Sequence, residues 1–225
     1  EFLFLIDKKY RNQCLDLFSL SKSQLRQDLF VLSELNFKAS GFFVEFGATN
    51  GIDISNTFLL EKEFGWNGIL SEPAKVWHES LHKNRKAKIE KRCIWDESNK
   101  SILFHEANES EYSSSENYIN SDYHGNKRTH ATKYNVETIS LLDLLKKYSA
   151  PKIIDYLSID TEGSEFKILK DFNFEKYQFR IITCEHNFGP NREKIFNLLT
   201  SRGYKRKFEG ISKFEDWYVI DINLI

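Results

Sequence analysis

The sequence predicts an α/β protein with one mostly parallel sheet, and three observations lead to this prediction. Short apolar runs of strand length alternate with segments of helical periodicity, which is typical of βαβ units. The chain has 225 residues, 40% of them hydrophobic, which is enough for one sizeable core. Aromatic residues reach 15% and prolines number only 3, so the composition excludes a mainly disordered chain.

The first 40 residues are polar and helix-prone. Apolar side chains between Leu15 and Leu32 recur with helical spacing and predict one or two amphipathic helices. No linker rich in proline, glycine or serine follows them. We therefore expect residues 1–40 to form a helical segment that packs on a domain formed by residues 41–225.

Strands are predicted where apolar runs end at turn signals. The first run ends in a Gly-Ala pair, and Pro73 closes the second. The tail, KRKFEG followed by DWYVID, predicts a closing hairpin. The predicted strands are residues 41–48, 66–73, 88–95, 101–107, 153–160, 179–186 and 216–221.

Helices are predicted between most of these strands. Residues 138–148 carry lysines in their last turn, and Pro151 lies beyond it. The last helix stops at Gly203. The predicted helices are residues 55–64, 74–84, 138–148, 164–172 and 191–204.

Charge and hydropathy limit the partners of the chain. Lys plus Arg is 32 and Asp plus Glu is 33, so the net charge of -1 argues against nucleic acid as a partner. No apolar run approaches the roughly 18 residues of a membrane span. Three widely spaced cysteines without a CxxC pair predict buried thiols in a reducing compartment, and we expect a cytoplasmic protein.

The chain begins at Glu1 and contains no methionine, so we interpret it as a fragment. We expect it to belong to a longer multidomain chain or to form a homo-oligomer.

Ligands of parallel α/β sheets bind at the carboxyl ends of the strands. The first predicted strand ends in a glycine turn that lets the backbone approach a ligand. The fingerprint GxGxxG is absent, which disfavours a pyrophosphate but is compatible with a ligand that carries an amino-acid ammonium group. Glu72 follows at about the 20-residue distance from which an acidic residue commonly binds a ribose diol. The alternative is a tight turn without a ligand. The residues of this turn are Glu45, Gly47, Ala48, Asn50 and Gly51.

Acidic and imidazole groups follow two later strands. Asp160 and Glu162 end the run at 153–160, and Glu185 and His186 end the run at 179–186. If these strands are neighbours, the four groups meet on one rim of the sheet. Carboxylates beside a histidine suit a general base or a divalent metal, and the spacing leaves both readings open.

These residues resemble a known family. The ordered set GFFVEFGATNG, SNT, GWNGILSEP, IDTEGSEFKIL and EHN resembles the FkbM family of S-adenosylmethionine-dependent methyltransferases. SQLRQD (Ser23 to Asp28) also fits one branch of that family. The resemblance covers roughly residues 23–220.

The resemblance implies a class I Rossmann-like methyltransferase fold. Such a fold has a mostly parallel seven-stranded sheet with helices on both faces and a C-terminal antiparallel hairpin. The implied activity is methyl transfer from S-adenosylmethionine to a hydroxyl of a sugar, sugar nucleotide or glycan. The alternatives are a small natural product or an amine as acceptor, or a Rossmann-like interaction module without catalysis.

The resemblance also implies roles by position. The turn residues Glu45, Gly47, Ala48, Asn50 and Gly51 would hold the methionine part of the cofactor, and Glu72 its ribose hydroxyls. Cys93, Ile94 and Trp95 would flank the adenine, with Asp96 as its candidate acidic partner. Asp160 would border the cofactor and, with Glu162, the reacting centre.

A sugar hydroxyl is a poor nucleophile, so transfer needs a base or a metal. We hypothesise that His186 is the base or a metal ligand. By analogy of position with catechol-type O-methyltransferases, Asp160, Glu185 and His186 would hold a divalent metal. A histidine ligand would favour iron, manganese or zinc over magnesium.

Residues 108–135 lack clear periodicity, and a segment of this length without structure is commonly a functional or mobile loop. We expect acceptor recognition here by Tyr112, Ser113, Ser114 and His130, because rings stack on sugar faces and hydroxyls bind their OH groups. The alternative is an ordinary surface insertion.

Overall fold

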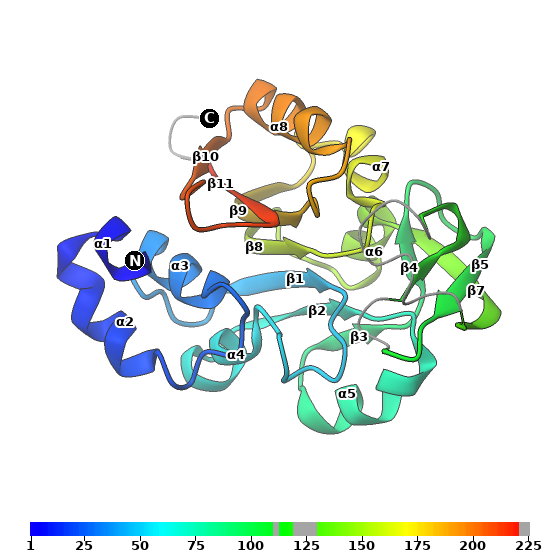
Figure 1. Ribbon diagram of the computed structural model, residues 1–225, viewed down its shortest axis with the longest axis horizontal. Helices are drawn as coiled ribbons and strands as arrows, with labels where there is room; N and C mark the ends of the chain where they lie inside the picture. Colours follow the sequence, from blue (N-terminus) through cyan, green and yellow to red (C-terminus); the bar gives the residue numbers. More distant parts are fainter. Residues whose placement is uncertain (110–112, 119–129, 221–225) are drawn as a thin grey trace.

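The computed structural model describes residues 1–109, 113–118 and 130–220 (Figure 1). Its centre is a seven-stranded sheet in which β11 alone runs against its neighbours. Parallel pairs join β3, β2, β1, β8 and β9, and β11 is antiparallel to both β9 and β10. This confirms the mostly parallel sheet with a C-terminal antiparallel hairpin. The spatial order is β10 (Lys205–Lys207), β11 (Glu215–Val219), β9 (Gln178–Glu185), β8 (Ile153–Ile159), β1 (Phe42–Phe46), β2 (Asn67–Ser71) and β3 (Lys88–Glu90).

A second, four-stranded sheet stands beside the first and was not predicted. Its order is β4 (Cys93–Trp95), β7 (Thr132–Ser140), β5 (Ser101–Glu106) and β6 (Ser114–Ser115). The prediction of one strand over 88–95 was therefore wrong. The Glu90 carboxylate accepts the backbone N–H groups of Lys91 and Arg92, so the chain turns there and leaves the main sheet.

The helix predicted over 138–148 begins later, because the preceding residues are the end of β7. The Oγ of Ser140 accepts the N–H of Asp143 and caps α6. Part of the expected loop at 108–135 is also ordered, since β6, a 3-10 turn η4 (Glu116–Tyr118) and the start of β7 lie within it.

Helices cover both faces of the main sheet (Figure 1). One apolar cluster joins Val44 and Leu157 to α6, α7 and α8. The other joins Phe43 and Tyr156 to α3, α4 and α5. The helices are α1 (Phe2–Leu5), α2 (Arg11–Leu17), α3 (Gln27–Glu34), α4 (Phe58–Phe64), α5 (His78–Asn84), α6 (Leu141–Lys147), α7 (Glu165–Lys170) and α8 (Arg192–Ser201), with 3-10 turns η1 (Lys8–Tyr10) and η2 (Lys75–Trp77).

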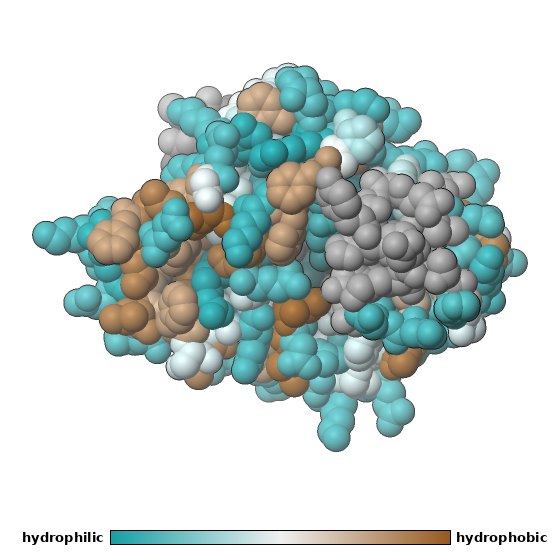
Figure 2. All heavy atoms as spheres, in the orientation of Figure 1, coloured by the Kyte–Doolittle hydropathy of each residue, from teal (hydrophilic) through white to brown (hydrophobic). Residues whose placement is uncertain are grey.

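The N-terminal segment is fastened to the sheet through α3. The Nε2 of Gln27 donates to Glu215 on β11 at 2.8 Å, and Phe30 packs against Trp217 with ring centroids 4.8 Å apart. Large apolar side chains remain exposed on α1, α2 and the turn that follows, and they form the brown area on the left of Figure 2. The segment therefore buries one side and leaves an apolar outer side. Within the described part of the chain, no helix has the length and apolar character needed to cross a membrane.

Candidate active site

A cleft opens at the carboxyl ends of β1, β2 and β8, as the sheet topology requires. Its far wall comes from the second sheet. The lining residues are Phe46, Gly47, Thr49, Ile54, Ser71, Glu72, Pro73, Cys93, Ile94, Trp95, Phe104, Ser113, Ser114, Ser115, Asp160, Thr161, Glu162 and Ser164. We name this the first cleft.

The first cleft needs glycine at the end of β1. Gly47 has a φ of +74°, and its N–H donates to the carbonyl of Ser71 at 3.0 Å. A Cβ at this position would lie 2.5 Å from the backbone oxygen of Asp160. Only glycine therefore lets β1 end this close to the loop that follows β8.

Glu72 offers a buried carboxylate on the floor of the first cleft. One oxygen accepts the N–H of Thr49 at 2.9 Å, and the other accepts the N–H of Ala74 at 2.8 Å. Each oxygen keeps a second lone pair for a hydroxyl donor. Burial, aided by the negative charges of Asp160 and Glu106, raises the pKa of Glu72 to about 7.

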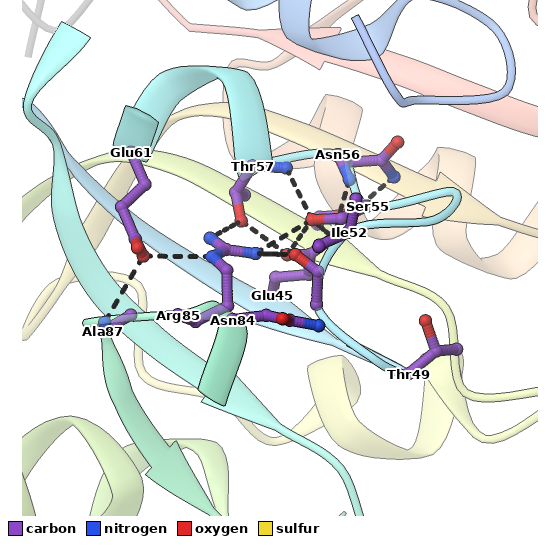
Figure 3. Close-up of polar contacts among 12 residues, drawn as sticks. Glu45, Thr49, Ile52, Ser55, Asn56, Thr57, Glu61, Asn84, Arg85 and Ala87 are labelled. Carbon is purple, nitrogen blue, oxygen red and sulfur yellow. Dashed lines mark hydrogen bonds and ion pairs between the residues drawn. The ribbon is translucent and has the colours of Figure 1, made fainter. Parts of the chain in front are cut away.

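Glu45 does not line the first cleft, in contrast to its expected place beside the cofactor. Its carboxylate accepts from the hydroxyls of Ser55 and Thr57 and from the N–H of Asn56 (Figure 3). Arg85, which is fully buried, lies 3.7 Å from it. Burial raises the pKa of Glu45, and Arg85 opposes that shift. Glu45 thus fixes the loop that leads from β1 to α4.

Arg85 joins that loop to α4. Its Nε donates to Glu61 at 3.0 Å, and its two Nη atoms donate to the carbonyl of Gly51, the Oγ of Ser55 and the Oγ1 of Thr57 (Figure 3). Arg85 could not be singled out from the sequence, because an arginine between a helix and a strand is typical of an ordinary surface position.

The other predicted turn residues help to fix the conformation of the turn itself. The Oδ1 of Asn50 accepts the N–H groups of Ile52 and Asp53, while Ala48 is buried. Gly51 has a φ of +81°, and a Cβ there would lie 2.6 Å from the Cγ of Arg85. None of Ala48, Asn50 and Gly51 lines the first cleft.

The expected adenine flank does lie in the first cleft. Cys93, Ile94 and Trp95 line it, joined by Phe104 of β5. Burial raises the pKa of the Cys93 thiol to about 12, so it stays neutral. Asp96 instead pairs with Lys167 at 3.4 Å and is not a lining residue. Thr49 and Phe104 were not singled out from the sequence, although Thr49 stands inside the glycine turn.

Three carboxylates meet where β8 and β9 end. One oxygen from each of Asp160, Glu162 and Glu185 lies within 4.8 Å of the other two. Burial raises the pKa of Glu185 well above its usual range, and the charges of Asp160 and Glu162 raise it further. We name these residues the carboxylate triad.

A second cleft lies on the other side of the 161–164 loop. It is lined by Tyr118, Gly163, Glu165, Glu185, His186, Asn187, Gly189, Pro190, Asn191 and Ile195. Because Asp160 and Glu162 line the first cleft and Glu185 lines the second, the carboxylate triad separates the two.

His186 is not part of the carboxylate triad. Its Nδ1 accepts the N–H of Phe188 at 3.0 Å, so the proton of the neutral ring sits on Nε2, 3.7 Å from the Oδ1 of Asp216. Burial lowers the pKa of His186, although Asp216 favours its charged form. In this arrangement neither ring nitrogen offers a lone pair to a substrate or a metal.

The predicted acceptor loop is described in part. Ser113 and Ser114 line the first cleft, and the Oγ of Ser114 donates to the carbonyl of Glu162 at 3.2 Å. Tyr118 reaches the second cleft. His130 is exposed and lines neither cleft, and Tyr112 lies outside the described residues.

Comparisons with known proteins bear on the fold and the family of the chain. The chain is similar to the crystal structure of a methyltransferase FkbM from Methylobacillus flagellatus KT, with 11% identity and a TM-score of 0.56. The match covers 94% of this chain but 52% of that protein, so the chain spans about half its length. At this identity the likeness shows the fold, a class I methyltransferase fold. No curated protein shows significant similarity to the chain.

The sequence itself matches a model of the methyltransferase FkbM domain over residues 45–206. This match runs from the end of β1 to β10 and includes both clefts and the carboxylate triad. The chain belongs to the FkbM family of S-adenosylmethionine-dependent methyltransferases.

Proposed function

We propose that this chain transfers a methyl group from S-adenosylmethionine to a hydroxyl of a sugar, sugar nucleotide or glycan. The observation that carries the proposal is the carboxylate triad, which lies between a cleft suited to the cofactor and a second cleft whose lining includes asparagine and glutamate side chains. The family supplies the cofactor class, while the oxygen acceptor is inferred from the chemistry of the site.

The first cleft fits a nucleoside. Trp95 and Phe104 offer aromatic surface for a base, and the spare lone pairs of Glu72 suit the two hydroxyls of a ribose. Gly47 and Thr49 would face the amino-acid end. When bound, S-adenosylmethionine supplies an electrophilic methyl group.

A hydroxyl acceptor has to lose its proton as it attacks, and this favours a site with a base. Asp160 and Glu162 line the first cleft and lie beside Glu185 of the second, and either can accept that proton. His186 is a weaker choice than we expected from the sequence, since its Nδ1 is used by the backbone. Burial, together with the charges of Asp160 and Glu162, raises the pKa of Glu185, so this member of the triad has the raised proton affinity that a base for a hydroxyl requires.

The second cleft suits a polar acceptor. Tyr118 offers a ring, and the side chains of Asn187 and Asn191 can bind hydroxyl groups. Ser113 and Ser114 line the first cleft and, with Tyr118 in the second, support the proposal that the 108–135 segment recognises a carbohydrate acceptor. The free, buried thiols of Cys14, Cys93 and Cys184 favour a reducing compartment such as the cytoplasm.

The test combines cofactor binding with acceptor screening. Calorimetry should show S-adenosylhomocysteine binding, and labelled methyl should pass to sugars or sugar nucleotides in preference to amines. Glu72→Gln should weaken cofactor binding, whereas Glu193→Gln, a change in the first turn of α8, should not. Absence of cofactor binding would leave only an interaction module, and transfer to amines alone would overturn the hydroxyl assignment.

A further inference from the structure

We propose that the carboxylate triad, Asp160, Glu162 and Glu185, is a binding site for a divalent cation of the Mg²⁺ or Mn²⁺ class. This ligand set differs from the one expected from the sequence, because Glu162 takes the place of His186.

The geometry of the triad is close to that of a metal site. Oxygens around an octahedral Mg²⁺ with bonds of 2.0–2.1 Å lie roughly 3 to 4 Å apart. The three carboxylate oxygens already lie within 4.8 Å of one another, so small side-chain rotations would bring them around one ion. Asp160 directly follows β8 and Glu185 ends the adjacent strand β9, while Glu162 lies in the 161–164 loop.

Glu185 carries the second, independent observation. It is 8% exposed, and its Oε2 is buried without a hydrogen-bond partner among the described residues. Its carboxylate faces Asp160 and Glu162, so the nearest charges repel it. Within the described ranges, no lysine or arginine forms an ion pair with Glu185. Burying such an acceptor costs free energy unless a ligand donates a hydrogen bond to it or is coordinated by it.

Glu90 is a buried glutamate whose charge is compensated by cations of the chain itself. It is 4% exposed, and it pairs with Arg92 at 2.9 Å and with Lys147 at 2.8 Å. Those cations hold the pKa of Glu90 low, at about 2, despite its burial. The contrast shows that, among the described residues, Glu185 lacks the compensating cation that Glu90 has.

The donor set selects the kind of cation. Three carboxylates offer only hard oxygen ligands, which favour Mg²⁺ or Mn²⁺ over zinc or copper. One oxygen from each residue would leave coordination positions open, and Mg²⁺ sites commonly keep such positions for water or substrate.

The position suggests a role that rests on the proposed function. A cation between the two clefts would hold an acceptor oxygen and lower the pKa of its hydroxyl. The proton would then pass to solvent, because Asp160 and Glu162, which could accept it in the metal-free site, would be metal ligands. Binding of the cation itself does not depend on that function, so the two can be tested apart.

The experiment is a titration of the metal-free protein with Mn²⁺, followed by the electron paramagnetic resonance signal of the free ion. The wild type should bind one Mn²⁺ per chain, and Mg²⁺ should displace it. Glu185→Gln and Glu162→Gln should each weaken binding by roughly tenfold or more, since each removes one anionic ligand of similar shape. Glu90→Gln is the matched control and should bind Mn²⁺ like the wild type.

Circular dichroism and urea unfolding report whether each variant folds, and if one variant fails to fold, the other decides. Binding of S-adenosylhomocysteine is measured on the same samples. A wild type that binds the nucleoside but no Mn²⁺ would overturn the cation site and leave the proposed function intact. Mn²⁺ binding that survives both glutamate variants would also overturn the site. Mn²⁺ binding without nucleoside binding would refute the proposed function and leave the cation site standing.

Discussion

Replacing Arg85 by methionine tests how the loop behind the first cleft is stabilised. The guanidinium is fully buried, donates four hydrogen bonds of 2.8 to 3.0 Å, and lies 3.7 Å from Glu45. Methionine has similar length but neither charge nor donors. The variant would leave Glu45 and Glu61 buried without their cation and the carbonyl of Gly51 without its donor.

The expected loss is large because a charge is left uncompensated. Breaking a buried ion pair from one side costs about 3–5 kcal/mol. For a chain of this size, each kcal/mol lowers the melting temperature by roughly 2–4 °C, so a fall of about 6–20 °C is expected. Adding Glu45→Gln and Glu61→Gln to the variant should recover part of the loss, since no uncompensated charge then remains.

Urea unfolding followed by tryptophan fluorescence gives the free energy. Lys146→Met is the control, because Lys146 forms an exposed pair with Asp143 and its loss should cost no more than about 0.5 kcal/mol. Equal losses for Arg85→Met and Lys146→Met would refute the reasoning.

Three further predictions concern the sheet edge and its buried acids. Gly47→Ala should abolish binding of S-adenosylhomocysteine, measured by calorimetry, and should lower the unfolding free energy more than Gly65→Ala does. Gly65 also has a positive φ, of +64°, but a Cβ there would have nothing within 4 Å. Equal losses of stability in urea unfolding would contradict the close approach of residue 47 to Asp160. Since ribose hydroxyls need the ionised form of Glu72, whose pKa is about 7, the nucleoside should bind roughly tenfold more weakly at pH 6 than at pH 8; Glu72→Gln should remove this dependence, and a flat wild-type profile would count against it. Burial raises the pKa of Glu215 to about 7, so the protonated side chain stabilises the folded state at low pH. This stabilisation is lost as the pH rises from about 4.5 to 7. Between pH 5 and pH 8 the wild type should therefore lose roughly 2 kcal/mol more unfolding free energy than Glu215→Gln, and parallel urea profiles would disprove this.

The main sheet was predictable because its strands are short, continuous apolar runs that end at glycine or proline. Patterns of this kind depend on local sequence, and they located β1, β2, β8 and β9 to within a few residues. The break between β3 and β4 was not predictable, since it depends on the Glu90 carboxylate turning back onto its own backbone. The second sheet was missed for a different reason, because its strands pair across long stretches of chain.

The candidate site was predictable in position but less so in residue roles. Strand ends led to Gly47, Glu72, Cys93, Ile94 and Asp160, which all line the first cleft. Whether an acidic side chain faces a cleft or the interior depends on its partners. The sequence does not show that Arg85 lies against Glu45 in the interior and compensates its charge.

The same limit applies to His186. A histidine at a strand end reads as a ligand or base until its backbone surroundings are known. The N–H of Phe188 occupies Nδ1 because the chain turns back directly after β9. That turn depends on tertiary contacts with residue 214, which lies far along the sequence.

The departure of the chain from the main sheet after β3 has a consequence for affinity. Glu72 follows a strand of the main sheet, whereas Cys93, Trp95 and Phe104 belong to the second sheet. A nucleoside between them would therefore contact two sheets that are hydrogen-bonded separately. Its binding energy would depend on the angle between those sheets as well as on any single contact. Substitution of Val136, which packs with Trp95 and Phe104 in the apolar cluster of the second sheet but does not line the first cleft, would then alter how tightly the cofactor is held.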